Sequence, residues 1–425
     1  MFTSFSTALS ALNADSTAID VVGNDLANLN TPGYKATELC FSDLVTQSLG
    51  AGLGVTQVGF GVAQPITEAQ YTQQGAIQTS GGLDDAAIQG DGFFVVANSA
   101  GNLQYTRAGD FQTDASGNLT TATGDYVQGW TTVDPNTGQV DTNGPIGNIV
   151  VPVGTLKPPV ATTQITASLN LNASSAADAT SDFTMPITVY DSLGNSHVLT
   201  LDFQNTGGNT WSYQATVPGS DVSGGTAGTP FDISGASGTL SFDSNGDLTS
   251  PAAGSPITFT VPGLADGASD MNLSWNSYDS AGNSTITQFG QPSAYSATSQ
   301  NGSAAVQLNQ VGMGSGGQIL AEYTDGSQVV VGQVAMASIR NPDTLIAAGS
   351  NNLTLSSLTA NPAIGMPGTG GRGTIVGGSI EASTVDIASE FTSLIVYQQA
   401  YEANAHVVTT ADQLSQDTIN LIQPT

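Results

Sequence analysis

The chain has 425 residues, of which 34 are acidic and 5 are basic, and its formal net charge is -29. The five cations (Lys35, Arg107, Lys157, Arg340 and Arg372) are scattered along the sequence, which argues against a basic surface that binds nucleic acid or an anionic membrane. Cys40 is the only cysteine, which excludes an internal disulfide or a paired-cysteine site, and the absence of an apolar run of about 18 residues predicts no membrane insertion.

The first 28 residues show the apolar spacing of an amphipathic helix. Apolar residues recur at intervals of three and four, which predicts a helix with a coiled-coil-like seam. Thr31, Pro32 and Gly33 end the helix, because proline lacks the amide that a helix needs and glycine permits a positive φ. The predicted seam residues are Phe2, Phe5, Leu9, Leu12, Ile19 and Leu26, with Ser16 and Gly23 at the remaining seam positions.

The middle of the chain is rich in glycine, asparagine, serine and threonine and contains short alternating runs typical of strands. Examples are residues 87–96, 185–190, 197–204 and 328–339. The pattern Asp-x-x-Gly-Asn/Asp occurs at 114–118, 191–195, 243–247 and 279–283. An aspartate starts such turns through its side chain and glycine supplies positive φ. We therefore predict antiparallel β domains.

Proline-containing segments at 155–164 and 288–299 indicate a linker and its return, with one β domain inserted into another between them. After the second β region, residues 379–423 contain neither proline nor glycine, and the same apolar rhythm predicts a second helix of about 40 residues. Its seam residues are Ile387, Phe391, Leu394, Tyr401 and Val408. The predicted fold class is α + β and multi-domain: a coiled-coil-like stalk of terminal helices, with two mainly antiparallel β domains, one inserted in the other.

Motifs of enzyme chemistry are weak in this sequence. Two matches to G-x-G-x-x-G, at 312–317 and 368–373, do not open a helix inside a βαβ unit and are interpreted as loops. His197 and His406 have no metal-ligand spacing, and the aspartate turns do not continue to an EF-hand glutamate, although a weak calcium site stays an alternative. We expect no catalytic, cofactor or metal residues, while carboxylate pairs keep a hydrolase open.

Each terminal helix has an apolar stripe that must be buried. The two stripes can bury each other in a monomer, or they can pack against further copies of the chain. Surfaces of small, weakly charged residues favour such self-association, and a contact that does not close on itself gives an open helical assembly. We favour self-assembly into a filament and keep the two-helix stalk of a monomer as the alternative.

Residues 24–35, NDLANLNTPGYK, resemble the signature of bacterial flagellar rod and hook proteins, N-x-[IL]-A-N-x-x-T-x-G-[FY]-K. The resemblance continues at residues 83–96, 105–130 and 380–413, and residues 189–203 together with the chain length resemble the hook branch of the family. Near residues 300–308 the sequence departs from the family pattern, where a tighter glycine-containing turn is expected. The matching signature residues are Asn24, Leu26, Ala27, Asn28, Thr31, Gly33, Tyr34 and Lys35.

The resemblance implies a structural subunit that self-assembles into a flexible tube and acts as a universal joint. It implies an inner tube of residues 1–30 with 380–425, a linking region of 31–72 with 363–379, an outer β domain of 73–157 with 289–362, and an inserted distal β domain of 158–288. It also implies export through the flagellar type III apparatus without a cleaved signal peptide, with Phe5 and Leu9 as a candidate export signal. Lys35 is expected to meet an acidic neighbour.

The partners implied by the resemblance are further copies of the chain, a rod protein, a hook-filament junction protein, the hook cap and the export apparatus. The expected location is the extracellular flagellar hook. Two alternatives stay open: a distal rod protein of the same family, and a secreted β-rich adhesin or enzyme.

Overall fold

The computed structural model describes residues 2–44, 46–49, 56–134, 137–178 and 183–422. The chain divides into two compact units. Unit 1 comprises Met1–Val153 and Asn309–Thr425, and unit 2 comprises Gly154–Leu308. No described helix is long and apolar enough to cross a membrane.

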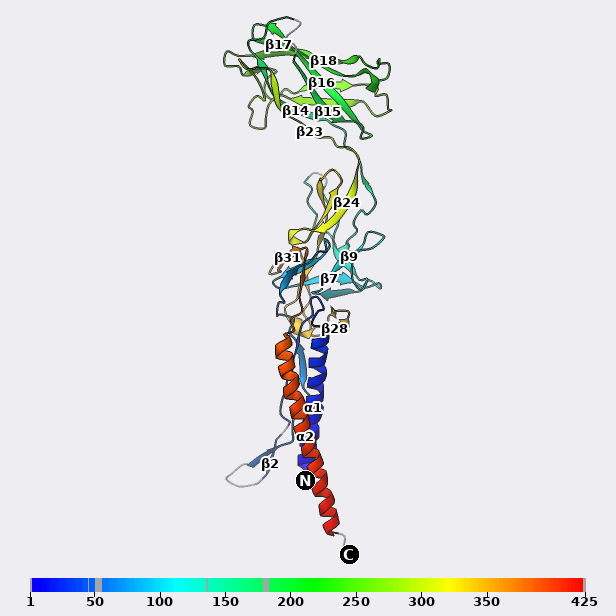
Figure 1. Ribbon diagram of the computed structural model, residues 1–425, viewed down its shortest axis with the longest axis vertical. Coiled ribbons are helices and arrows are strands. Elements are labelled where there is room, and N and C mark those ends of the chain that lie inside the picture. The colour runs from blue at the N-terminus through cyan, green and yellow to red at the C-terminus, as the bar shows by residue number, and fades with distance from the viewer. Residues whose placement is uncertain (1, 45, 50–55, 135–136, 179–182, 423–425) are drawn as a thin grey trace. The chain divides into compact units, whose positions relative to one another are not determined.

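Unit 1 contains two long helices that pack side by side, α1 (Phe2–Ala27) and α2 (Ile387–Ile422) (Figure 1). The expected fold class is confirmed. The second helix is shorter at its start than the proline-free segment suggested, because Ser379–Glu381 forms strand β32 and pairs with β5 (Ile77–Thr79). Asp386 then caps α2, since its Oδ1 accepts the amides of Ala388 and Ser389 at 2.8 and 3.2 Å.

The β region of unit 1 is built on a large, mainly antiparallel sheet with the strand order β24-β25-β26-β11-β7-β8-β29-β28. Glycine-rich turns join its short strands, and two apolar clusters cover its faces, one around Phe94 and Met336 and one around Phe93 and Trp130. The bounds of these strands are β7 (Phe93–Ala97), β8 (Leu103–Thr106), β11 (Tyr126–Trp130), β24 (Val306–Met313), β25 (Gln318–Tyr323), β26 (Gln328–Val334), β28 (Ile346–Gly349) and β29 (Asn352–Thr354).

Shorter pairs complete unit 1. The segment that leaves α1 forms the pairs β1–β4 and β2–β3, and the segment that leads into α2 pairs with residues 77–89. The bounds are β1 (Thr37–Cys40), β2 (Thr46–Leu49), β3 (Thr56–Gly59), β4 (Ile66–Ala69), β6 (Ala86–Gln89), β9 (Phe111–Thr113), β10 (Leu119–Thr121), β12 (Gly147–Asn148), β27 (Met336–Ser338), β30 (Ala363–Gly365) and β31 (Thr374–Gly377).

Unit 2 is a sandwich of two sheets, with the strand orders β15-β16-β17-β18-β19 and β20-β21-β14-β22, and β23 pairs with β14. Its core lies between the sheets, where Phe203 and Tyr213 meet the ring of Trp275 edge-on. The bounds are β13 (Leu156–Lys157), β14 (Gln164–Asn172), β15 (Phe183–Tyr190), β16 (Ser196–Gly207), β17 (Thr210–Pro218), η1 (Gly219–Asp221), β18 (Pro230–Phe242), β19 (Leu248–Ser250), β20 (Ile257–Val261), β21 (Met271–Asn276), β22 (Ile286–Phe289) and β23 (Ala294–Gln300).

The four aspartate turns have the predicted geometry. In each of them the first aspartate accepts the amides of the third and fifth residues, as Asp279 does from Ala281 and Asn283 at 2.9 and 2.8 Å. Each turn glycine has positive φ, between 84° and 89°. The turn chemistry therefore follows directly from the sequence pattern.

Candidate functional site

Helix α1 packs against α2, and its buried side chains are mostly small. They are Ala8, Ala14, Asp15, Ala18, Val22 and Asp25. Asn404 Nδ2 of α2 donates a hydrogen bond to Asp15 Oδ2 of α1 at 2.9 Å. Segment 61–62 also packs on α1, where the amide of Val62 donates to Ser10 Oγ. Most of the buried positions fall on a three-four spacing directly before the predicted seam residues.

The predicted seam of α1 therefore lies beside the contact with α2. Phe5 and Leu9 keep 41% and 46% of their surface exposed, while Leu12, Ile19 and Leu26 are half-buried. The side chain of Phe2 lies outside the part of the chain that the structure describes. The seam thus leaves an apolar strip on the helix surface after the two helices have paired.

Helix α2 exposes more of its apolar side chains than α1 does. Ile387, Phe391 and Tyr401 are exposed, and Leu394 and Val408 are half-buried. Ile395, Val396, Val407, Leu414 and Ile419 add further exposed apolar side chains. The helix pair therefore leaves large apolar side chains of both helices exposed to water, which is typical of a surface that another chain covers.

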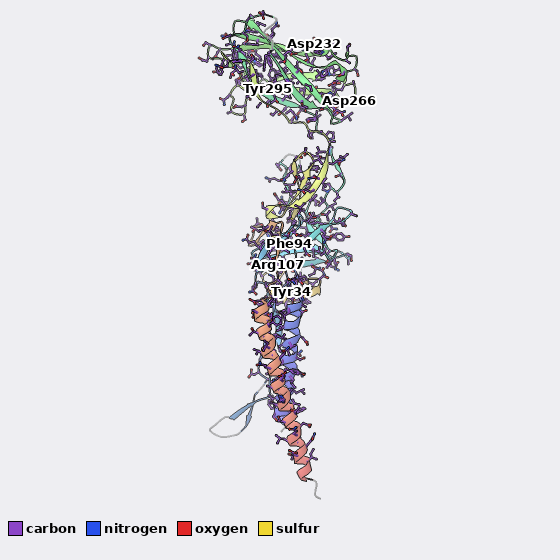
Figure 2. All side chains as sticks on the ribbon, viewed as in Figure 1. Tyr34, Phe94, Arg107, Asp232, Asp266 and Tyr295 are labelled. Atoms are coloured by element: carbon purple, nitrogen blue, oxygen red, sulfur yellow. The ribbon has the colours of Figure 1, made fainter. Side chains whose placement is uncertain are left out.

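The turn after α1 brings the signature residues together at the end of the helix pair that adjoins the β region, where Figure 2 labels Tyr34 and Arg107. Asn28 links back to the helix through its Nδ2, which donates to the carbonyl of Asn24 at 2.9 Å, and its Oδ1 accepts the hydroxyl of Thr31 at 3.0 Å. The carbonyl of Pro32 accepts a hydrogen bond from Asn351 Nδ2 at 2.7 Å. The signature thus fixes the direction in which the chain leaves the helix.

Gly33 occupies a position that excludes any side chain. Its φ is 68°, and a Cβ there would lie 2.5 Å from the backbone of Arg107 and Ala108. Its amide donates to the carbonyl of Glu381 at 2.8 Å. Gly33 therefore lets the turn touch both the β region and the strand that leads to α2.

Replacement of Gly33 with alanine should destabilise unit 1 by at least about 2 kcal/mol, since left-handed backbone alone costs about 1–2 kcal/mol and the clash with backbone atoms adds to it. Chemical denaturation followed by hydrogen exchange of unit 1 peptides measures the loss. Gly23→Ala is the matched control, because a Cβ at Gly23 meets nothing within 4 Å; it should leave the free chain equally or more stable. Equal stability of Gly33→Ala and wild type would contradict the geometric argument.

Tyr34 and Asp25 form a second part of the junction. The Tyr34 hydroxyl donates to Asp25 Oδ1 at 2.7 Å and accepts from Asn24 Nδ2 at 2.8 Å, while Asp25 Oδ2 accepts the amide of Thr37 at 2.8 Å. Burial raises the pKa of the Asp25 carboxyl, and the hydrogen bonds from Thr37 and Tyr34 oppose that rise. Burial and the neighbouring carboxylate raise the pKa of Tyr34. The ring is thus a hydrogen-bonded anchor for the linking segment.

Lys35 meets the acidic partner that the sequence left unnamed, and it is Glu381. Lys35 Nζ lies 2.6 Å from Glu381 Oε1, and Arg107 Nη1 lies 3.4 Å from Glu381 Oε2. The amide of Gly75 also donates to Glu381 Oε1 at 2.8 Å, and the Arg107 guanidinium covers the ring of Phe93 at 5.3 Å. One buried carboxylate therefore joins the segment after α1, the β region and the segment before α2.

These charges are held out of water. The Glu381 side chain is fully buried, and those of Lys35 and Arg107 are nearly so. Burial lowers the pKa of both cations, and the carboxylate of Glu381 counteracts this shift. A buried charge that loses its partner destabilises the fold. The ionic cluster of Lys35, Arg107 and Glu381 therefore fixes one arrangement of the junction.

Sequence reasoning missed Glu381, Arg107 and Asp25 as members of this junction. Asp25 lies inside NDLANLN, and Glu381 lies in the second helical block, but both are acids among 34 in the chain. The only signal in the sequence was the scarcity of basic residues, which indicated that Lys35 pairs with an acid. The sequence did not identify that acid, because each of the five cations had many possible partners. The predicted export residues Phe5 and Leu9 lie on the exposed strip of α1, away from the ionic cluster in sequence.

Four family models match the chain. They are described as Flagella basal body rod protein (residues 5–35), Flagellar hook protein FlgE/F/G D1 domain (87–166), Flagellar basal body protein FlaE D2 domain (160–303) and Flagellar basal body rod FlgEFG protein C-terminal (376–421). The resemblance to the rod and hook family is thereby confirmed at both ends and in the middle of the chain.

Curated relatives match over nearly the whole length. A protein named Flagellar hook protein FlgE from Borreliella burgdorferi is 32% identical, with 99% of this chain and 100% of that protein covered. The protein of the same name from Escherichia coli is 32% identical over 98% and 99%. A crystal structure of Helicobacter pylori flagellar hook protein FlgE2 shares the fold, with a TM-score of 0.50 and 14% identity over 70% of this chain and 98% of that chain.

Proposed function

The chain belongs to the flagellar hook protein FlgE family and is a structural part of the extracellular flagellum, and we propose that its copies assemble into the flexible helical tube that couples the motor and rod to the filament. The single observation that carries this proposal is the apolar surface that remains on α1 and α2 after they pair. Phe5, Leu9, Phe391 and Ile395 are among its exposed side chains. A continuous polymer buries such a surface in every subunit.

The subunit contacts are proposed to run along the predicted seams. Buried apolar area contributes roughly 25 cal/mol per Å². Because these contacts repeat in every subunit, they would provide most of the free energy that holds the tube together. Residues 1–30 with 380–425 would then line the inner tube, with 31–72 and 363–379 as the linking region. Residues 73–157 with 289–362 and residues 158–288 would lie outside as the outer and distal β domains.

Bending of the tube is proposed to take place between the outer β surfaces. These surfaces are rich in glycine and uncharged polar residues, and the chain has only 5 basic residues to form ion pairs with neighbours. Contacts of this kind exchange partners at little cost, because few strong charge pairs must break. The buried ionic cluster would keep each subunit's helices attached to its β region while the outer contacts slide.

The same proposal includes the specific partners of the tube. The tube would join a rod protein at its proximal end and a hook-filament junction protein at its distal end, and a hook cap would guide its growth. The flagellar type III apparatus would export the chain, with Phe5 and Leu9 in the candidate export signal. A distal rod protein of the same family is the second candidate. The match of residues 160–303 to a model of the D2 domain favours the hook subunit.

Electron microscopy of the purified chain tests the proposal. Concentration of the chain above its critical concentration should give tubes of uniform diameter. Antibody labelling of isolated basal bodies should then mark the curved segment outside the rod, whereas a label confined to the rod would identify a rod protein. A chain that stays monomeric at every concentration, with antibody labelling neither structure, would contradict the proposal.

A further inference from the structure

Unit 2 contains a group of ionisable side chains that has no role in the proposed function above. His197 lies at the start of β16, and three aspartates surround its ring: Asp191 from the preceding turn, Asp221 from η1 and Asp266 from the loop before β21. Figure 2 labels Asp266 in this unit. The four groups come from three separate segments, so the fold and not local sequence brings them together.

Three of these groups have the spacing of metal ligands. His197 Nε2 lies 3.1 Å from Asp191 Oδ2 and 3.7 Å from Asp266 Oδ2, and the three atoms lie within 4.8 Å of one another. A tetrahedral ion with bonds of about 2.1 Å holds its ligand atoms about 3.4 Å apart. The two distances lie on either side of that value, so the three atoms are close enough to share one ion in place of the present contact between His197 and Asp191.

Each of the three groups is also oriented by a further hydrogen bond. His197 Nδ1 lies 3.0 Å from Asp221 Oδ2, which directs Nε2 toward the other two aspartates. Asp191 Oδ1 accepts the amides of Leu193 and Asn195, and Asp266 Oδ2 accepts Asn195 Nδ2 at 2.9 Å. A carboxylate behind a metal-bound histidine, and donors behind metal-bound carboxylates, are the usual supports of such sites.

Charge and accessibility agree with a bound cation. Three carboxylates around one imidazole leave net negative charge in either protonation state of the ring, and Lys157 is the only lysine or arginine in residues 154–308. Asp191 and His197 are buried, whereas Asp266 is exposed. An ion can therefore enter from the side of Asp266 and keep a position open to water.

The other aspartate turns provide an internal comparison. Asp243 and Asp279 in unit 2 start turns of the same pattern and hydrogen bonding. Neither belongs to a described group of three metal-ligating side chains, whereas Asp191 does. The turn geometry alone therefore does not create the cluster; His197 and Asp266 distinguish it.

We propose that His197, Asp191 and Asp266 bind one divalent transition-metal ion, of the chemistry of Zn²⁺, with Asp221 as the positioning residue for the imidazole. The imidazole nitrogen favours such an ion over Ca²⁺ or Mg²⁺, which prefer oxygen ligands. The ion would tie β16 to the loop before β21. It would thereby stabilise one edge of the unit in the extracellular environment.

Titration calorimetry of the unassembled, metal-stripped full chain with ZnCl₂ tests this site. We expect one ion per chain, with affinity reduced at least about 10-fold by His197→Gln and by Asp266→Asn, and about 10-fold to 100-fold by Asp221→Asn. Asp279→Asn, a matched turn, and His406→Gln, the other histidine, should bind Zn²⁺ like wild type. CaCl₂ should give no saturable binding at the concentration that saturates with Zn²⁺.

Nitrogen NMR of the imidazole gives a second readout, since the chain has only two histidines. Zn²⁺ should shift Nε2 of His197 and leave its Nδ1 protonated. Asp266→Asn removes an exposed ligand and keeps the test valid if His197→Gln fails to fold. Absence of saturable Zn²⁺ binding, equal binding by wild type and Asp266→Asn, or loss of binding only in His406→Gln would each overturn the proposal.

Discussion

Replacing Glu381 with glutamine should destabilise unit 1 by about 3–5 kcal/mol, the range expected when one partner of a buried ion pair is removed. The substitution leaves Lys35 and Arg107 buried without their shared counter-charge. Hydrogen exchange with mass spectrometry should show faster exchange in β6, β7 and the segment before α2, while β16 and β17 of unit 2 stay protected. Glu38→Gln, an exposed glutamate on β1, is the matched control and should change stability little.

The pH dependence of this loss identifies its cause. Burial already lowers the pKa of Lys35, and Glu381 is the group that raises it, so the variant should hold Lys35 at a still lower pKa. A folded-state pKa below the unfolded value means that the unfolded chain binds more protons, and stability then rises with pH. The difference in stability between wild type and Glu381→Gln should therefore shrink as pH rises from 7 toward 10. A difference that is independent of pH would contradict the electrostatic explanation.

Phe391→Asp should strongly weaken assembly while leaving the free chain folded. Phe391 is 52% exposed, so its substitution removes little packing within the chain. Burial of a phenylalanine side chain contributes about 1.5–3 kcal/mol, and an aspartate in the same contact adds a desolvation cost. Since each 1.4 kcal/mol is tenfold in an association constant, the critical concentration should rise at least about 100-fold.

Sedimentation of polymer at increasing concentration measures this change. Phe391→Leu is the control, because it keeps an apolar side chain and should raise the critical concentration by less than about tenfold. Leu9→Asp tests the strip on α1 in the same assay. Normal assembly of both aspartate variants would show that these helix faces do not lie between subunits.

Most of the architecture follows from the sequence. Apolar spacing of three and four located both helices, and the proline and glycine after Asn30 ended the first one. Alternating runs and aspartate turns located strands such as β15 and β16. The start of α2 was misplaced because a segment without proline or glycine is equally compatible with a strand, and pairing of Ser379–Glu381 with β5 decides the matter.

The junction was harder to predict than the elements that it joins. The signature identified Gly33, Tyr34 and Lys35, and the scarcity of cations indicated that Lys35 needs an acidic partner. The identity of that partner depends on how residues 346 positions apart meet. Local patterns carry no information on such a contact.

The apolar spacing also did not identify the face of α1 that packs against the rest of the chain. Large apolar residues suggested the seam, but the buried positions Ala8, Ala18 and Val22 are mostly small. Small side chains permit close approach of α1 to its neighbours, and the larger ones are left on the adjacent strip. The sequence also did not reveal the cluster of His197 with its three aspartates. Asp221 and Asp266 reach the imidazole ring from segments that are distant in the sequence.

Helical reconstruction of assembled tubes by cryo-electron microscopy is the decisive test of the proposed assembly. We expect α1 and α2 to line the lumen, with Phe391 and Leu9 within contact distance of apolar side chains from neighbouring copies, and with the β regions outside. Tubes in which the helix faces point to solvent, and in which only β surfaces join the subunits, would contradict it.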